Sequence, residues 1–224
     1  ETLSRIAILA EEIDAPVHTH LHETADEIAQ GLAQHGVRPL ERLRRLGLVG
    51  PRLIAVHAVH LEEAEIELLA REGASIAHCP SSNLKLASGI APIAACLARG
   101  VNVGLGTDGA ASNNNLDQFE TMDFTGKAHK LVRHDPTAMP ARAIVRMATI
   151  DGARALGLDD SIGSLETGKQ ADLVLIDTRV PELTPMYDVY AHLVYSVRGA
   201  NVRTVLVGGR VVVRDRTVTT VDAA

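Results

Sequence analysis

The segment Pro16-Val-His-Thr-His-Leu-His-Glu23 joins a short β-branched run to a cluster of imidazoles and a carboxylate. Two later segments have the same design: His57-Ala-Val-His60 follows an apolar run, and Gly106-Thr-Asp-Gly109 follows another. Each polar group lies where a buried strand is predicted to end. Because the carboxyl ends of parallel strands meet at one face of a barrel or open sheet, we expect these groups to form one site.

Strand and helix patterns alternate outward from these segments. Four short β-branched or apolar runs are predicted as strands, at 16–20, 53–56, 74–77 and 101–105. Helical patterns surround them at 3–13, 24–35, 39–46, 61–71 and 90–99, and the segment from Cys79 to Asn83 is predicted as a loop. This alternation favours a parallel sheet built from right-handed βαβ units, and hence an α/β fold.

The number of strands limits the architecture. A closed (β/α)8 barrel needs eight strands, and four strands leave two open edges that soluble proteins normally cover. The chain also begins at Glu1 rather than at Met. The sequence therefore favours the second half of a (β/α)8 TIM barrel, strands 5 to 8, completed by an N-terminal half of the same protein or by another chain. A small open α/β sheet is the alternative.

The predicted secondary structure changes from helix to strand after Gly163. Two long helical patterns, 116–132 and 141–156, come before it, and three β-type runs follow, with Gly208-Gly209 typical of a hairpin. We therefore assign residues 1–163 to the C-terminal half of the barrel and residues 164–224 to the C-terminal part of a small β-sandwich domain. The strands of this tail are expected to lack partners that upstream sequence would provide.

The composition excludes several classes of protein. The 224 residues are 46% hydrophobic and carry a formal net charge of −6, which argues against a nucleic-acid partner because such proteins cluster Lys and Arg. No uninterrupted apolar stretch reaches the roughly 18–20 residues of a membrane span. The two cysteines, Cys79 and Cys96, imply no disulfide framework and fit a reducing cytoplasm.

The first segment already suggests metal chemistry. His18 and His20 alternate along a strand, so their imidazoles project to the same side, which suits a bidentate grip on a metal ion. A hydrogen-bonded surface pair is the simpler alternative. Glu23 lies just past the strand end, where its carboxylate reaches the same space without binding metal, as a proton shuttle requires.

His57 and Asp108 extend this interpretation to two further strands. Taken alone, His57 fits a hydrogen-bonded core histidine, and an Asp in a Gly-flanked turn is common. Three strand ends, in chain order, that carry His, His and Asp beside a Glu have no such ordinary explanation. The combination indicates a metal-dependent active site formed by His20, Glu23, His57 and Asp108.

Six segments of the chain have a recognisable pattern: His20-Leu-His-Glu23, Val56-His-Ala-Val-His60, Pro80-Ser-Ser-Asn-Leu-Lys-Leu86, Gly89-Ile-Ala-Pro92, Gly104-Leu-Gly-Thr-Asp-Gly-Ala-Ala-Ser-Asn-Asn114 and Gly163-Ser-Leu-Glu-Thr-Gly-Lys-Gln-Ala-Asp-Leu-Val174. Together they resemble the amidohydrolase superfamily. Within it they are most similar to the 5-methylthioadenosine/S-adenosylhomocysteine deaminase branch, which is grouped with the triazine hydrolases. The resemblance covers essentially the whole chain.

The resemblance implies a metal-dependent (β/α)8 barrel with one divalent metal ion, usually Zn²⁺. It implies that His20 and Asp108 are metal ligands and that Glu23 is the acid/base group that contacts the substrate. His57 is implied to lie beside the attacking water, and Asp108 to take the proton of that water and to contact the substrate. Ser112 contacts the substrate or caps the following helix. The two remaining ligands of the family form a His-x-His on the first strand, which this sequence lacks upstream of His20.

The favoured function is hydrolytic deamination of the adenine ring of 5-methylthioadenosine, S-adenosylhomocysteine or adenosine, with release of ammonia. The expected substrate is a small purine nucleoside, and the enzyme is expected to be a homo-oligomer. A triazine, guanine or oxidised-purine hydrolase on the same barrel is an alternative, because function resides in the loops. A metal-free binding or assembly protein is a further alternative, disfavoured by the joint presence of Glu23, His57 and Asp108.

Overall fold

The computed structural model describes residues 2–221, which contain two four-stranded sheets. The first sheet is parallel, and its strands lie side by side in chain order: β1 (Val17–Leu21), β2 (Leu53–His57), β3 (Ser75–His78) and β4 (Asn102–Leu105). His20 lies opposite Val56 and Leu21 opposite His57, so these strands end at a common edge. All four predicted strands are confirmed, with ends shifted by one residue at most.

Helix α1 (Thr2–Glu12) precedes β1, and further helices connect the successive strands: α2 (Ala25–His35), α3 (Pro39–Arg45), α4 (Glu63–Glu72) and α6 (Ile93–Ala98). The ends of α2 follow the predicted signals, because the Thr24 side chain accepts the N–H of Glu27 at its start and Gly36 closes it with a φ of 68°. Aliphatic side chains of the sheet and helices form the core, among them Leu21, Leu53, Leu69, Ile76 and Ile93. Within residues 2–221, no helix is both long and apolar enough to cross a membrane.

The segment from Pro80 to Lys85 forms a helix, α5, so the predicted loop at 79–83 is wrong. Pro80 lies in the first turn, where a helix needs no N–H from that residue, and the following Ser-Ser-Asn run can therefore continue as a helix. Ser82 and Asn83 are buried in α5. The helix thus places short polar side chains directly beyond the end of β3.

The stretch predicted as one helix at 141–156 is two helices, α9 (Ala141–Met147) and α10 (Ile150–Ala155). The chain turns at Thr149, whose φ of −131° and ψ of −101° are not helical. This turn brings Gly152 against Gly104: a Cβ atom on Gly104 would lie 2.9 Å from the Cα of Gly152. A contact between residues so far apart in sequence leaves no local signal. Before α9, the chain forms α7 (Ala110–Asn113) and α8 (Gln118–Arg133).

The second sheet is antiparallel, in the order β5 (Leu173–Ile176), β6 (Val202–Val207), β7 (Arg210–Arg214) and β8 (Thr217–Val218). Gly208 and Gly209, with φ of 55° and 79°, form the predicted hairpin between β6 and β7. Between β5 and β6 lie η1 (Pro181–Leu183), α11 (Val189–Tyr195) and η2 (Gly199–Asn201).

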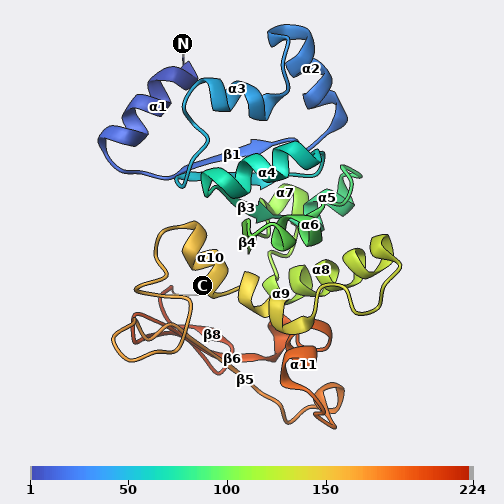
Figure 1. Ribbon diagram of the computed structural model, residues 1–224. Coiled ribbons are helices and arrows are strands. Elements are labelled where there is room, and N and C mark those ends of the chain that lie inside the picture. Colours follow the sequence, from blue (N-terminus) through green and yellow to red (C-terminus); the bar gives the residue numbers. More distant parts are fainter. Residues whose placement is uncertain (1, 222–224) are drawn as a thin grey trace.

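The two sheets lie at opposite sides of α9 and α10 (Figure 1). We propose a domain boundary between residues 163 and 164, where the helices give way to the second sheet. α11 lies beyond this boundary in sequence but packs against α8 and α9. The two parts are therefore joined by a helical contact as well as by the chain.

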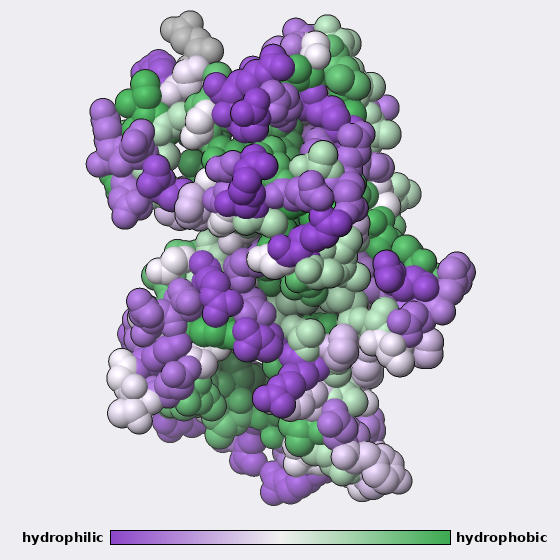
Figure 2. Space-filling model, viewed as in Figure 1, coloured by the Kyte–Doolittle hydropathy of each residue, from purple (hydrophilic) through white to green (hydrophobic). Residues whose placement is uncertain are grey.

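An apolar groove of about 620 Å³ lies between the parallel sheet, α10 and β5. Its lining includes Ile54 and Gly104 from the sheet, Met147 from α9 and Val174 from β5. Hydrophobic residues also gather in a hollow in the lower half of the molecule, where the second sheet lies (Figure 2). The described chain thus exposes apolar surface around both sheets.

Candidate active site

Three side chains converge at the carboxyl edge of the parallel sheet. His20 comes from β1, His57 ends β2, and Asp108 follows β4. Each offers one potential ligand atom, and these three atoms lie within 4.8 Å of one another. Among residues 2–221, this is the one group of three or more His, Cys, Asp and Glu residues with such spacing. Three of the four residues predicted for the site are therefore brought together.

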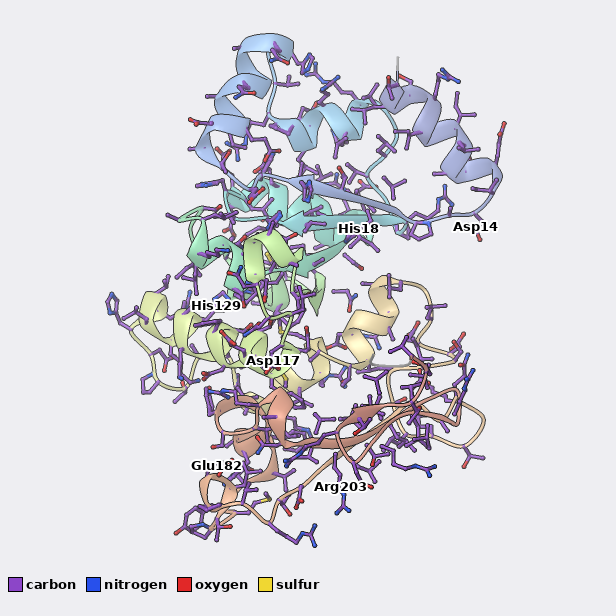
Figure 3. The ribbon with its side chains drawn as sticks, turned by 180° about the vertical axis from the view of Figure 1, so that it is seen from behind. Asp14, His18, Asp117, His129, Glu182 and Arg203 are labelled. Atoms are coloured by element: carbon purple, nitrogen blue, oxygen red, sulfur yellow. The ribbon has the colours of Figure 1, made fainter. Side chains whose placement is uncertain are left out.

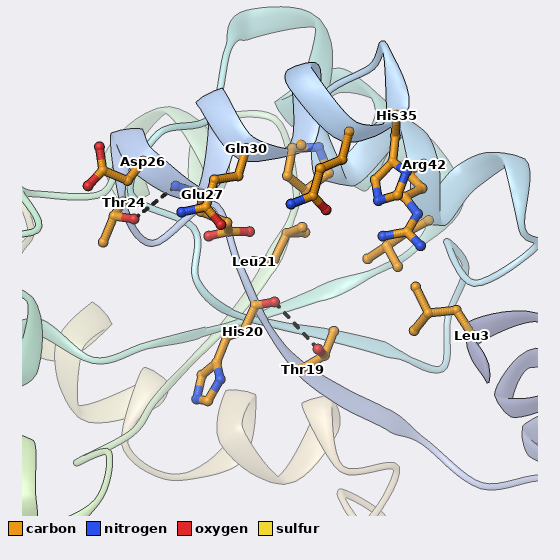
Figure 4. Close-up of a pocket in the computed structure, with 14 residues that line it drawn as sticks. Leu3, Thr19, His20, Leu21, Thr24, Asp26, Glu27, Gln30, His35 and Arg42 are labelled. Carbon is orange, nitrogen blue, oxygen red and sulfur yellow. Dashed lines mark hydrogen bonds between the residues drawn. The ribbon is translucent and has the colours of Figure 1, made fainter. Parts of the chain in front are cut away.

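His20 and His57 form the imidazole side of this group. Their rings stack with centroids 5.3 Å apart and an angle of 29° between the planes. The ring of His20 points away from α2, on the other side of β1 (Figure 4). The pocket drawn there, about 480 Å³ between β1, α2 and α3, has His20 in its lining but neither His57 nor Asp108.

His18 does not join His20 in the group of three. It lies one strand repeat before His20, roughly 6–7 Å further from the strand end, and lines the apolar groove instead (Figure 3). The two imidazoles share a face of the strand, as expected, but the spacing along β1 separates them. This arrangement does not support binding of one metal ion by both His18 and His20.

His57 is buried, with 1% of its surface exposed, and its φ of 71° lies in the left-handed region. Its Nδ1 lies 2.8 Å from the Oδ1 of Asn83. Its Nε2 lies 3.7 Å from the Oε2 of Glu23. The side of the ring that faces the group of three is therefore the Nε2 side.

Asp108 also has a left-handed backbone, with a φ of 61°. Its Oδ2 accepts hydrogen bonds from the hydroxyls of Ser82 and Ser112, both at 2.6 Å. Partial burial acts to raise the pKa of Asp108, but the bonds from Ser112, Ser82 and the Gly109 N–H outweigh it and lower the pKa to about 2. Asp108 is therefore a carboxylate at neutral pH.

The same geometry rules out one of the two roles predicted for Ser112, which were contact with the substrate and capping of the following helix. Ser112 lies inside α7 and bonds to Asp108, while the following helix, α8, has Asp117 as its N-cap. The prediction that Ser112 caps the following helix is wrong. Its contact with the substrate stays a prediction.

Glu23 lies just beyond β1, with about a quarter of its side chain exposed. Its Oε1 is 3.5 Å from the hydroxyl of Ser88. The Glu27 carboxylate accepts the N–H groups of His22 and Glu23, at 2.9 and 2.7 Å, and so fixes the backbone on which the Glu23 side chain stands. Sequence reasoning missed Glu27, although Thr24-x-x-Glu27 is the pattern of a capping box.

Sequence reasoning also gave no role to the residues of α5 that contact the site, Ser82 and Asn83. The pattern that could have indicated them is a run of small polar residues at the end of a buried strand. His60 supports the same region, since its Nε2 donates to the carbonyl of Ser88 at 3.1 Å. His60 thus contacts the loop at Ser88 and lies outside the group of three.

A second histidine pair lies deeper in the molecule. The Nε2 atoms of His78, at the end of β3, and His129, in α8, are 3.2 Å apart, and both residues are buried. Burial lowers the pKa of His78 well below its usual value and that of His129 to about 4. Both rings are therefore neutral at pH 7.

The donor set of the group of three fits a zinc ion. Zn²⁺ in proteins takes imidazole nitrogens and carboxylate oxygens, and catalytic zinc sites use a few such ligands and leave a position open. His20 and Asp108 supply one ligand of each kind, and the Nε2 of His57 faces the same space. The carboxyl edge of a parallel α/β sheet is also where barrels and open sheets of this kind place their metal-dependent active sites.

The comparison with protein families identifies the family. The amidohydrolase family profile matches residues 1–212, and the chain belongs to this family. It is 49% identical over 220 residues to 5-methylthioadenosine/S-adenosylhomocysteine deaminase of Syntrophobacter fumaroxidans, covering 98% of this chain and 50% of that protein. It is 48% identical over 215 residues to 5'-deoxyadenosine deaminase of Methanothermobacter thermautotrophicus, covering 96% of this chain and 50% of that protein. The chain thus spans about half the length of the curated relatives that it matches.

Solved structures agree with this assignment. An adenosine deaminase from Xanthomonas campestris with bound zinc matches with a TM-score of 0.96 and 48% identity, over 98% of this chain and 50% of that one. Atrazine chlorohydrolase from Arthrobacter aurescens, in complex with zinc, matches with a TM-score of 0.89 and 30% identity, over 98% and 49%. The fold is therefore the second half of a (β/α)8 barrel followed by strands of a small β-sandwich, as predicted.

Proposed function

We propose that the intact protein is a zinc-dependent aminohydrolase that removes the amino group from the adenine ring of 5-methylthioadenosine, S-adenosylhomocysteine or adenosine. The observation that carries this proposal is the group formed by His20, His57 and Asp108, with Glu23 beside it. The names of the relatives support the substrate class, since both curated relatives described above are deaminases of 5′-modified adenosines.

His20 and Asp108 are the residues proposed to hold the metal. When bound, zinc lowers the pKa of water to about 7 and so supplies a nucleophile at neutral pH. Every other part of the reaction falls to side chains of the protein. Asp108, ionised and fixed by two serine hydroxyls, accepts a proton from the attacking water. His57 accepts a hydrogen bond from the same water at Nε2 and thereby orients it.

Glu23 is proposed as the proton carrier. Its carboxyl group lies beside Nε2 of His57 and keeps contact with solvent. In its protonated form it donates to the ring nitrogen next to C6 while the oxygen of water adds to C6. A second proton transfer to the exocyclic amino group breaks the C6–N bond, and ammonia leaves. The product carries an oxo group at C6.

The alternative enzymes, which hydrolyse a triazine, guanine or an oxidised purine, would use the same metal and side chains but a different substrate and leaving group. The atrazine chlorohydrolase matches at 30% identity, whereas the deaminases of 5′-modified adenosines match at 48–49%. The higher identity favours 5-methylthioadenosine, S-adenosylhomocysteine or adenosine over a triazine. A homo-oligomeric assembly and a place in the cytoplasm belong to the same proposal.

The test is an ammonia-release assay on the intact protein, with zinc content measured on the same sample. We expect release from S-adenosylhomocysteine, 5-methylthioadenosine or adenosine, and little from guanine or a triazine. Release from guanine or a triazine alone would move the protein to another branch of the family. A metal-free protein that binds nucleosides without releasing ammonia would replace the enzyme proposal with a binding role.

A further inference from the structure

α5 supports the candidate site from behind the strand ends. Ser82 donates to the Oδ2 of Asp108 at 2.6 Å, and the next residue, Asn83, contacts the Nδ1 of His57 at 2.8 Å. One short helix thus contacts two residues that come from different strands. The contact of Asn83 does more than pack two side chains together, because it influences which ring nitrogen of His57 carries the proton.

Asn83 restricts His57 to one tautomer. Asn83 has 1% of its surface exposed, and His57 is equally buried, so water does not compete for this contact. An amide oxygen only accepts hydrogen bonds, so the Nδ1 of His57 must donate to it. A neutral imidazole carries a single N–H. In its neutral form, His57 then carries its lone pair on Nε2, which faces the site.

The groups around Nε2 of His57 favour the other tautomer, with the proton on Nε2. The Glu23 carboxylate lies 3.7 Å from Nε2, and the ring of His20 stacks at 5.3 Å between centroids. Asp108, a carboxylate, contributes a potential ligand atom within 4.8 Å of one on His57. Both carboxylates favour an N–H at Nε2. The Nδ1–H tautomer therefore depends on the single bond to Asn83.

We propose that Asn83 is a positioning residue that holds His57 as the Nδ1–H tautomer, so that Nε2 can accept a hydrogen bond from the attacking water. This inference rests on the proposed function for its role in catalysis. The other tautomer presents an N–H at Nε2, which donates to Glu23 and cannot accept from water. The amide orientation is part of the proposal, since turning it would place Nδ2 against Nδ1 and force the other tautomer.

The direct test is the ¹⁵N spectrum of the histidine rings in the intact, chelator-treated protein, with the His57 signals identified by their loss in His57→Gln. We expect a protonated Nδ1 and a bare Nε2 in the wild type and in Asn83→Asp, which keeps the acceptor oxygen. In Asn83→Leu, which keeps the shape without the acceptor, the ratio of Nδ1–H to Nε2–H should fall by roughly fivefold to tenfold.

Asn114→Asp is the matched control. It adds the same charge to a neighbouring segment, where the Asn114 side chain accepts from Lys85 at 2.6 Å, and it should leave the His57 signals unchanged. A wild-type spectrum with the proton on Nε2 overturns the proposal, even where the Leu variant does not fold. An unchanged ratio in a folded Leu variant overturns it as well.

Ammonia release separates this inference from the proposed function. We expect kcat to fall about tenfold in Asn83→Leu with KM nearly unchanged, because Asn83 is buried and acts through His57, and to recover mostly in Asn83→Asp. Equal kcat in the wild type and the Leu variant contradicts the positioning role. A wild-type protein that releases no ammonia from any nucleoside contradicts the proposed function, while the ¹⁵N spectrum still decides which tautomer Asn83 holds.

Discussion

Three of the four proposed reactive residues at the candidate site, Glu23, His57 and Asp108, contact a supporting side chain. Ser82 holds Asp108, and Glu27 holds the backbone of Glu23. Because reactive and supporting roles fall on different residues, a substitution at a reactive residue can remove chemistry and leave the local structure in place.

Glu23→Gln tests this separation in the intact protein. The amide keeps the shape and the hydrogen bonds of the side chain but cannot carry a proton, so ammonia release should fall by about 10²–10⁴-fold with zinc content nearly unchanged. His20→Ala should lose both zinc and activity, because it removes a proposed ligand. Plasma emission and an ammonia assay measure the two quantities.

Glu67→Gln is the control for these variants, since Glu67 is an exposed partner of Arg99 on the surface. It should keep both zinc and activity. Loss of zinc in Glu23→Gln would make Glu23 a ligand and contradict its assignment as the proton carrier.

His129 makes stability depend on pH. Its pKa is about 4 in the folded protein, because of burial, against about 6.5 for an unperturbed histidine. The unfolded chain therefore binds more protons between these values. The stabilising contribution is complete above pH 6.5 and is lost as the pH falls to about 4, by about 3 kcal/mol in total.

Urea unfolding at pH 7 and pH 4.5 measures this loss. The difference between the two free energies of unfolding should shrink in His129→Gln and stay the same in His35→Gln, because His35 is exposed. An equal difference in the wild type and His129→Gln would assign the pH dependence to other groups.

The shared location of the proposed reactive residues could be predicted from the sequence, and that of the supporting residues could not. His20, Glu23, His57 and Asp108 stand at the ends of apolar runs, so their shared edge follows from the order of the strands. Ser82 and Asn83 act on partners 26 residues away in the chain, and nothing local marks that pairing.

At the scale of elements, local signals fix the strands and the capped helices, whereas contacts between elements fix the rest. The strand pattern and the signals at Thr24 and Gly36 predict β1 and α2 almost to the residue. The division into α9 and α10 was not predictable, because it depends on the close approach of α10 to Gly104.

Gly104→Ala tests this packing. A Cβ atom there would meet the Cα of Gly152 at 2.9 Å, which is backbone and cannot move aside freely. We expect the free energy of unfolding to fall by about 1–3 kcal/mol in urea titrations. Gly50→Ala is the control, because a Cβ on Gly50 meets no atom within 4 Å, and it should change stability by less than about 0.5 kcal/mol. Equal stability of both variants would show that α10 yields to the added methyl group.

At the scale of the whole molecule, the described chain matches about half the length of its relatives and exposes apolar surface beside the site. Metal binding is therefore best measured on the intact protein. Zinc that binds only the folded state should raise the free energy of unfolding by about 2.7 kcal/mol at 100 times its dissociation constant. Thermal unfolding with zinc and with a chelator measures this shift, and His20→Ala should abolish it. An equal midpoint with and without zinc would contradict a metal site in the folded protein.

Three residues at or beside the strand ends, His22, His57 and Asp108, have φ between 54° and 71°. For residues other than glycine this conformation costs of order 1–2 kcal/mol, so two residues of the group of three, His57 and Asp108, lower the stability of the fold. Selection for stability alone would drive these positions toward glycine or asparagine. In a lineage released from selection for catalysis, we therefore expect His57 and Asp108 to be replaced early and the folded state to become more stable as activity disappears.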